Sequence, residues 1–163
     1  QKQVGVSSGI LYADKGGDET HRKILILANR NPIVPEQGEL NSKKISDDFL
    51  QHDNYRFEII INPCQRNNAT RKIIPIKGRE AIAEWFIDKA PKSWGFNVNP
   101  QTLEVSNNHV KCFEKKGHQV TQGYASVTGQ LEVTDKKRFI ESFQKGIGRG
   151  RAFGCGLLQV VPL

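Results

Sequence analysis

The chain has 163 residues, a length typical of one domain or of two very small ones. Hydrophobic residues make up 37% and charged residues 25%, which supplies a core without the charge excess of disordered chains. No apolar run approaches the ~20 residues that span a bilayer. Composition therefore argues against a membrane protein and against a collagen-like or low-complexity chain.

Charge and cysteine usage narrow the class of protein. Lysine and arginine number 24 against 17 aspartates and glutamates, so the net charge is +7. The pI near 9.4 is typical of nucleic-acid-binding domains, although many basic proteins bind no nucleic acid. Cys64, Cys112 and Cys155 lie far apart and outside CxxC spacing, which argues against a disulfide framework or a zinc site. We therefore expect a cytoplasmic protein without metal or cofactor.

The first seventy residues have the pattern of strands and loops. Ser8–Ala13, Arg22–Ala28 and Tyr55–Ile61 are short β-branched, aliphatic or aromatic runs, as strands require. Asn62-Pro63 ends the third run, because proline donates no ladder hydrogen bond and restricts the residue before it. A short helix is expected near Ile45–Gln51.

The second half contains helical and strand patterns in alternation. Apolar residues recur at helical spacing from about Gly78 to Lys89, and Ala90-Pro91 is expected to end that helix. Asp135 and Gly146 are the expected caps of a second helix. Strands are expected at Thr102–Val105, His109–Phe113, Gly123–Val133 and Gly154–Val161. The order matches the ferredoxin-like βαββαβ pattern if Tyr55–Ile61 or Ile73–Ile76 supplies its first strand.

The segment from Lys145 to Leu158 is the most informative motif. It combines five glycines in eleven positions with the cations of Lys145, Arg149 and Arg151. Exposed backbone N–H groups and guanidinium forks bind phosphate oxygens. The spacing matches neither Walker A nor GxGxxG. The alternative is a flexible helix-to-strand connection with incidental arginines.

Two further basic clusters suit phosphate contacts. Lys111, Lys115, Lys116 and His118 flank Gly117, and predict either a hairpin that enters a nucleic-acid groove or a solubilising hairpin tip. The third cluster precedes the first helix, where a solvated linker is the alternative. Its residues are Arg66, Arg71, Lys72, Lys77 and Arg79.

A catalytic set is not evident among these residues. None of the four histidines pairs with a cysteine or another histidine at metal-ligand spacing. No Ser-His-Asp order or nucleophile elbow is present. The histidines are His21, His52, His109 and His118.

The C-terminal glycines carry a family resemblance. Gly146-Ile147-Gly148, a five-residue gap and then Gly154-Cys155-Gly156-Leu157-Leu158 resemble the end of the CasE (Cse) family. These are CRISPR repeat-RNA endoribonucleases of type I-E Cascade, within the RAMP superfamily. Ile59–Pro63, Arg71–Ile76 and Gly129–Val133 resemble upstream segments of the family. The resemblance implies two ferredoxin-like domains in tandem that bind a repeat stem-loop.

The resemblance also implies a mechanism, and the chain departs from the family at one point. The family cleaves without metal, by attack of a ribose 2′-OH on the adjacent phosphate, and stays bound to its product within Cascade. Its catalytic histidine lies on a first helix that precedes the segment matching Ser8–Ala13, whereas only seven residues precede Ser8 here. We therefore expect the first strand and helix to be missing, and we assign no catalytic residue.

Together these observations predict an α+β chain with a partial ferredoxin-like domain over residues 1–70 and a complete one over residues 71–163. The expected function is processing and retention of CRISPR RNA together with other Cascade subunits. The alternatives are a non-catalytic subunit that binds a CRISPR RNA hairpin and a basic protein-interaction module. The expected RNA-binding residues are Lys145, Gly146, Gly148, Arg149, Gly150, Arg151, Lys111, Lys115, Lys116, His118, Arg66, Arg71 and Lys72.

Overall fold

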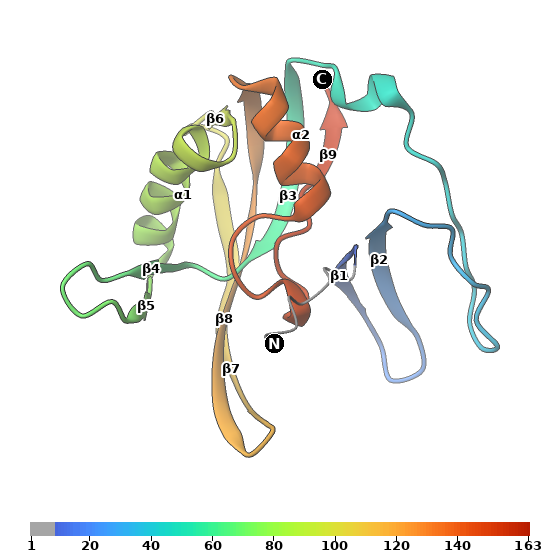
Figure 1. Cartoon of the computed structure of the whole chain (residues 1–163), viewed down its shortest axis with the longest axis horizontal. Coiled ribbons are helices and arrows are strands. Elements are labelled where there is room, and N and C mark those ends of the chain that lie inside the picture. The colour runs from blue at the N-terminus through green and yellow to red at the C-terminus, as the bar shows by residue number, and fades with distance from the viewer. Residues whose placement is uncertain (1–8) are drawn as a thin grey trace, which may run out of the picture.

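A five-stranded antiparallel sheet with two helices on one face forms the main body of the protein (Figure 1). The computed structural model describes residues 9–163. The elements in chain order are β1 (Ile10–Gly17), β2 (Arg22–Ala28), the 3-10 helix η1 (Asp47–Leu50), β3 (Asn54–Ile61), β4 (Cys64–Arg66), β5 (Ile73–Pro75), α1 (Arg79–Ser93), β6 (Phe96–Val98), β7 (Glu104–Lys115), β8 (His118–Val133), α2 (Lys136–Lys145), the 3-10 helix η2 (Arg151–Phe153) and β9 (Gln159–Pro162).

The order of the strands is that of a ferredoxin-like fold. The sheet runs β6-β8-β3-β9, with β7 paired to the remaining length of β8. β3 is therefore the first strand of the βαββαβ pattern, whereas Ile73–Pro75 pairs only with β4 in a small separate hairpin. Because β3 is a central strand here, the sheet formed by the second half of the chain includes residues before position 71. The division into domains at residue 70 stays a prediction.

Alternation along β3 separates the two faces of this sheet. Tyr55, Phe57, Ile59 and Ile61 are buried, while the residues between them face away from the helices. The Phe57 ring stacks on Phe86 of α1 at 5.7 Å between ring centroids. On the same face the Tyr55 ring lies 5.2 Å from that of Phe139 of α2. Burial of these side chains stabilises the fold by about 1.5–3 kcal/mol each.

The ends of the two helices test the capping predictions. α2 begins after Asp135, whose carboxylate accepts a hydrogen bond from the backbone N–H of Arg138 at 3.1 Å, and it ends at Gly146 as predicted. The prediction that Ala90-Pro91 ends the first helix is wrong, since α1 continues to Ser93. The Trp94 side chain holds this last turn, because it is buried with its ring centroid 5.1 Å from that of Phe86.

The hairpin of β7 and β8 extends well beyond the part of the sheet that the helices cover (Figure 1). The two strands predicted at Thr102–Val105 and His109–Phe113 are one strand, with a register irregularity between Ser106 and His109. Lys116 and Gly117 form the turn, with φ of 50° and 77°. Positive φ at both positions is the geometry of a type I′ hairpin turn.

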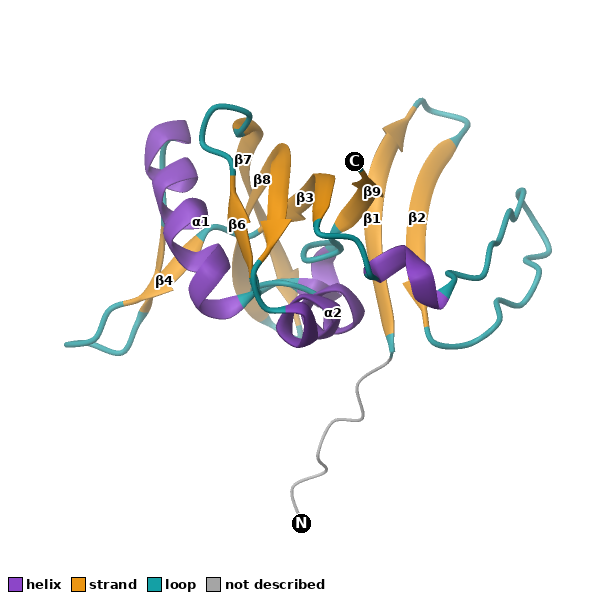
Figure 2. Cartoon of the chain, turned by 90° about the horizontal axis from the view of Figure 1, so that it is seen from above, coloured by secondary structure: helices purple, strands orange, loops and turns teal. Residues whose placement is uncertain are grey.

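β1 and β2 form a separate two-stranded hairpin beside the main body (Figure 2). Leu11 and Ala13 pack with Leu157 in a small apolar cluster, and Lys15 forms an ion pair with Glu58 of β3 at 2.9 Å. On β2 the side chains at positions 24–26 are 41–58% exposed, so this hairpin presents apolar area at its surface. Between residues 9 and 163, no helix is both long and apolar enough to cross a bilayer.

Candidate nucleic-acid interface

The glycine-rich loop, residues 146–158, connects α2 to β9. At two of its glycines a side chain would lie very close to neighbouring atoms. A Cβ on Gly150 would lie 2.4 Å from Nε2 of the buried Gln122, and a Cβ on Gly156 would lie 2.6 Å from the carbonyl oxygen of Ile147. Both glycines also have positive φ, which L side chains rarely adopt. Backbone conformation therefore favours glycine at both positions, and at Gly156 the backbone carbonyl of Ile147 also leaves no space for a side chain.

Hydrogen bonds fix this loop to the sheet and to the N-terminal hairpin. The N–H of Gly156 donates to the carbonyl of Ile60 in β3 at 2.8 Å. The Tyr12 hydroxyl of β1 donates to the carbonyl of Ala152, and the Tyr124 hydroxyl of β8 donates to that of Phe153, both at 3.1 Å. The strand predicted from Gly154 is therefore wrong for its first five residues, which form this bonded loop, and β9 begins only at Gln159.

The cations of the loop differ in their surroundings. Lys145 forms an ion pair with Glu141 at 2.9 Å, which partly neutralises it. Arg151 donates from Nε to the carbonyl of Gly148 at 3.2 Å and remains exposed. Arg149 is exposed and forms an isolated β-bridge with Asn62, the residue that follows β3. The loop thus presents two guanidinium groups at its surface.

One lysine of the β7–β8 hairpin lies against this loop, and a second lies against a tyrosine that is bonded to the loop. The Nζ atom of Lys115 lies 4.8 Å from the ring centroid of Phe153 in η2. The Nζ atom of Lys111 lies 5.2 Å from the ring centroid of Tyr124, whose hydroxyl bonds the loop. The first and second basic clusters of the sequence therefore form one surface. Lys116 and His118 occupy the exposed tip of the same hairpin.

The third basic cluster is divided between the β4–β5 hairpin and the start of α1, since Lys77 follows β5 and Arg79 is the first residue of the helix. Arg66 is in β4, while Arg71 and Lys72 follow the turn and precede β5. This hairpin extends in a different direction from the β7–β8 hairpin (Figure 1). Its base adjoins the glycine-rich loop, since Asn62 bridges Arg149. The β4–β5 hairpin is thus joined to the surface of the other two clusters only at its base.

The cations of loop residues 146–158 and of the two hairpins form no ion pairs within residues 9–163, a property that they share with other described cations such as Lys23, Arg30 and Lys137. Within residues 9–163, the ion pairs involve bases of β1, β2 and the two helices. In this same range, no lysine or arginine of the β4–β5 or β7–β8 hairpins takes part in one, and neither do Arg149 and Arg151. Their charge is therefore not neutralised by ion pairs with carboxylates of this part of the chain.

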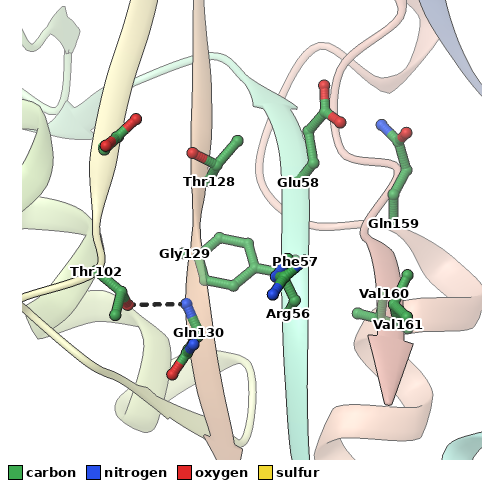
Figure 3. A pocket seen from close by; sticks show the side chains of 11 residues that line it. Arg56, Phe57, Glu58, Thr102, Thr128, Gly129, Gln130, Gln159, Val160 and Val161 are labelled. Carbon is green, nitrogen blue, oxygen red and sulfur yellow. Dashed lines mark hydrogen bonds between the residues drawn. The ribbon is translucent and has the colours of Figure 1, made fainter. Parts of the chain in front are cut away.

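The face of the sheet opposite the helices has a different character. A shallow cavity of about 480 Å³ lies on it, and Arg56, Glu58 and Gln159 project from β3 and β9 (Figure 3). Lys15 pairs with Glu58 and also donates to Oε1 of Gln159 at 2.9 Å. Glu104 lines the same cavity. Acidic and basic groups balance here, so this face has no excess positive charge for phosphates.

The four histidines are dispersed over the molecule. His21 contacts Thr20 through Nδ1 at 2.8 Å, His52 lies edge-on to Tyr55, and His109 stacks on Tyr124. Across residues 9–163 no group of three or more His, Cys, Asp or Glu side chains is arranged to hold a metal ion. The cysteines are free, and burial raises the pKa of the Cys155 thiol to about 12. The placement of the histidines therefore does not identify one of them as a general base.

Sequence reasoning missed the aromatic residues that hold this interface together. Tyr12, Tyr124 and Phe153 bond or pack against the loop, yet only the charged residues and glycines of the region were predicted. One signal was available. His109, Lys111, Phe113 and Lys115 alternate at every second position, and alternate positions of a strand share one face.

Comparison with known proteins identifies the family. A family model described as CRISPR associated protein matches residues 2–162. The CRISPR-associated endoribonuclease Cse3 of Thermus thermophilus is 27% identical over 117 residues, which are 66% of this chain and 55% of that protein. The aligned part therefore spans little more than half the length of this curated relative.

Solved structures share the fold. A CRISPR endoribonuclease Cse3 bound to a 19-nucleotide RNA superposes with a TM-score of 0.78 at 20% identity, over 94% of this chain and 80% of that chain. A chain of a CRISPR RNA-guided surveillance complex, pre-nicking, gives a TM-score of 0.68 at 18% identity, over 95% and 77%. These likenesses confirm the predicted fold class, an α+β chain with ferredoxin-like domains in tandem.

Proposed function

Because the chain belongs to the CRISPR-associated protein family, we propose that it binds the stem-loop of a CRISPR repeat RNA and processes the precursor RNA as an endoribonuclease. The observation that carries this proposal is the surface made by the glycine-rich loop and the β7–β8 hairpin. Arg149, Arg151, Lys111 and Lys115 gather there without ion pairs to carboxylates of residues 9–163. Cations in such an arrangement neutralise phosphates and fix the register of an RNA.

The proposed reaction is an internal transesterification. The ribose 2′-OH gives its proton to a base and attacks the adjacent phosphorus, the bond to the 5′-oxygen breaks, and that oxygen takes up a proton. The products are a 2′,3′-cyclic phosphate and a 5′-hydroxyl end, and no metal is required. Arg149 and Arg151 would stabilise the charge that develops on the phosphorus oxygens. The name of the curated relative, a CRISPR-associated endoribonuclease, supports this class of reaction.

The proposed partners follow from the same likenesses. A chain with this fold occurs in a CRISPR RNA-guided surveillance complex, which supports retention of the product RNA alongside other Cascade subunits. The three free cysteines support a cytoplasmic location, where thiols stay reduced. The RNA-binding residues that we propose are those of the three basic clusters, with the β4–β5 residues Arg66, Arg71 and Lys72 at the margin of the surface.

One observation favours a second function. His21 and His52 lie outside the loop and its neighbouring hairpin, and the His109 ring is stacked on Tyr124. His118 lies at the exposed tip of that hairpin, so none of the four is identified as a general base. A general base contributes about 10²–10⁴ to the rate of such a reaction. A non-catalytic subunit that holds the hairpin of a CRISPR RNA is therefore the alternative.

Repeat RNA from the host's own CRISPR array tests both functions in EDTA. We expect saturable binding of the hairpin and cleavage to a cyclic-phosphate end. A matched RNA with a single 2′-deoxy substitution at the cleaved position should bind equally well and stay intact. Binding of both RNAs without cleavage at saturating protein would support the non-catalytic subunit. Equal affinity for a scrambled RNA without a stem would contradict both functions.

A further inference from the structure

One face of the β7–β8 hairpin carries rings and ammonium groups in alternation. The register pairs His109 with Tyr124, Lys111 with Gln122, Phe113 with Val120 and Lys115 with His118. Residues paired across antiparallel strands share a face, and every second residue of a strand returns to it. We call the side chains of His109, Lys111, Phe113, Lys115 and Tyr124, with Phe153 of η2 packed on them, the aromatic–basic ladder.

The rings of the ladder form two packed pairs. The His109 and Tyr124 rings are nearly parallel, with centroids 5.2 Å apart and planes 12° apart. The Phe113 and Phe153 rings have centroids 5.1 Å apart. Lys111 lies over Tyr124 and Lys115 lies over Phe153, so each pair has its own cation. Phe153 and Tyr124 are also joined by the hydrogen bond from the Tyr124 hydroxyl.

The ladder is open to solvent, and the opposite face of the hairpin is different. His109 and both lysines are exposed, and the other three rings are half-buried. The opposite face carries the aliphatic Val110, 54% exposed, together with Cys112, Glu114 and Thr121. None of these side chains has a ring. Rings and cations are therefore segregated to the side of the hairpin that meets the glycine-rich loop.

We propose that the ladder binds an unpaired RNA segment next to the stem, with bases stacked on its rings and phosphates held by Lys111 and Lys115. This proposal rests on the proposed function and names the part of the RNA that this hairpin contacts. Bases in an A-form stem are already stacked on each other and are displayed in grooves, so rings that reach the surface favour unpaired bases. Lysines next to the rings can contact the phosphates of the RNA backbone, which stacking of the bases does not do.

The spacing of the two ring pairs supports a single extended strand. His109 and Phe113 are four residues apart on β7, which corresponds to about 13 Å. A strand of RNA that passes both pairs presents a different base to each. The balanced charge of the open sheet face makes that face a poor alternative for the same segment.

Three RNAs test the proposal: a blunt repeat hairpin, the same hairpin with an unpaired flank of about eight nucleotides, and the flank alone. Substituting His109→Ala or Phe113→Ala should weaken binding of the flanked hairpin by roughly tenfold, within the range for loss of one base stack. Binding of the blunt hairpin should change by less than about twofold. His109→Phe keeps a ring and should retain the affinity. Val110→Ala is the matched control on the opposite face.

A spectroscopic readout separates stacking from a structural role. 2-Aminopurine in the flank should lose fluorescence when the wild-type protein binds, and should lose much less with Phe113→Leu. If the flank adds no affinity to a hairpin that the wild type binds, the ladder proposal is overturned and the proposed function stands. If the flank binds alone but the blunt hairpin does not, the proposed function fails and the ladder stands. An equal loss of affinity for blunt and flanked hairpins would also overturn the ladder proposal.

Discussion

Two basic residues have a backbone conformation that disfavours them. In residues 9–163, Arg71 and Lys116 are the non-glycine residues with positive φ, at 56° and 50°. Lys116 occupies the turn of the β7–β8 hairpin and Arg71 directly follows the turn of the β4–β5 hairpin, and asparagine or glycine is easier to accommodate at such positions. Strain of this kind persists where function selects the side chain. The placement of positive charge at both turns therefore supports phosphate contacts there.

Lys116→Asn is expected to lower RNA affinity without lowering the stability of the fold. Asparagine tolerates the left-handed region, so the free energy of unfolding should stay the same or rise by up to about 1 kcal/mol. Affinity for the repeat hairpin should fall, because one cation is lost. Urea denaturation and RNA titration measure the two effects. Unchanged affinity in a stabilised variant would show that the lysine makes no phosphate contact.

Three glycines of the loop should differ in their tolerance of alanine. Gly148→Ala introduces only the cost of positive φ, about 1–2 kcal/mol, since its Cβ meets Ile61 at an ordinary 3.5 Å. Gly150→Ala also displaces Gln122, and Gly156→Ala meets the Ile147 carbonyl at 2.6 Å. Free energies of unfolding should therefore fall in the order Gly156, Gly150, Gly148, with the largest loss first. An equal loss at all three would contradict the packing of the loop.

The three thiols should differ in reactivity toward iodoacetamide at about pH 8, just below the ordinary pKa of a free thiol. The thiolate is the nucleophile, and burial holds the Cys155 pKa at about 12, so almost no thiolate forms there in the folded protein. Burial also raises the pKa of Cys64, whereas Cys112 is exposed. Intact mass should show Cys112 modified first, Cys64 more slowly and Cys155 only in guanidinium. Early modification of Cys155 would show that the loop opens.

At the scale of elements, the local sequence pattern predicted strands and helix caps correctly, but it placed the end of α1 wrongly at Pro91. Arg22–Ala28 and the caps Asp135 and Gly146 could be predicted because they depend on side chains within a few residues. The extension of α1 past Pro91 depends on burial of the Trp94 ring against Phe86, a contact that a local pattern does not contain.

The candidate interface was predictable in part for the same reason. Its cations and glycines lie together in sequence, so their clusters were visible. The contacts of Tyr124 and Lys115 with Phe153 join residues about 30 positions or more apart. Such pairings depend on the register of the sheet rather than on spacing. The merging of two basic clusters into one surface therefore needed the structure.

The distal β7–β8 hairpin should be separable from the folding of the main body. Among the side chains that the structure describes, none between positions 106 and 124 belongs to the main apolar core. Replacing Phe113–Val120 by Asn-Gly joins Cys112 to Thr121, which face each other, through a two-residue turn. The melting temperature should change by a few degrees only, while RNA affinity falls by at least roughly tenfold, because two lysines of the interface, Lys115 and Lys116, and the Phe113 ring are lost. Loss of cooperative unfolding would instead make the hairpin part of the core.

At the scale of the whole molecule, the net charge of +7 is unevenly distributed. Carboxylates pair with bases of the helices and of the β1–β2 hairpin, for example Asp14 with Arg22 at 2.6 Å. The open sheet face is balanced as well. The cations of the glycine-rich loop and of the two projecting hairpins form no ion pairs within residues 9–163, which leaves their charge available to the phosphates of a polyanion.

This distribution predicts how salt weakens RNA binding. Each phosphate that is neutralised contributes about −0.7 to −0.9 to the slope of log K against log salt concentration. Arg149→Gln and Lys115→Gln should each make the slope less negative by roughly one, because each removes one phosphate contact. Lys23→Gln, which removes the same charge from β2 of the N-terminal hairpin, should leave the slope unchanged. Filter-binding titrations from low to high salt measure these slopes. Equal slopes for all three variants would show that the net charge alone, rather than this surface, attracts the RNA.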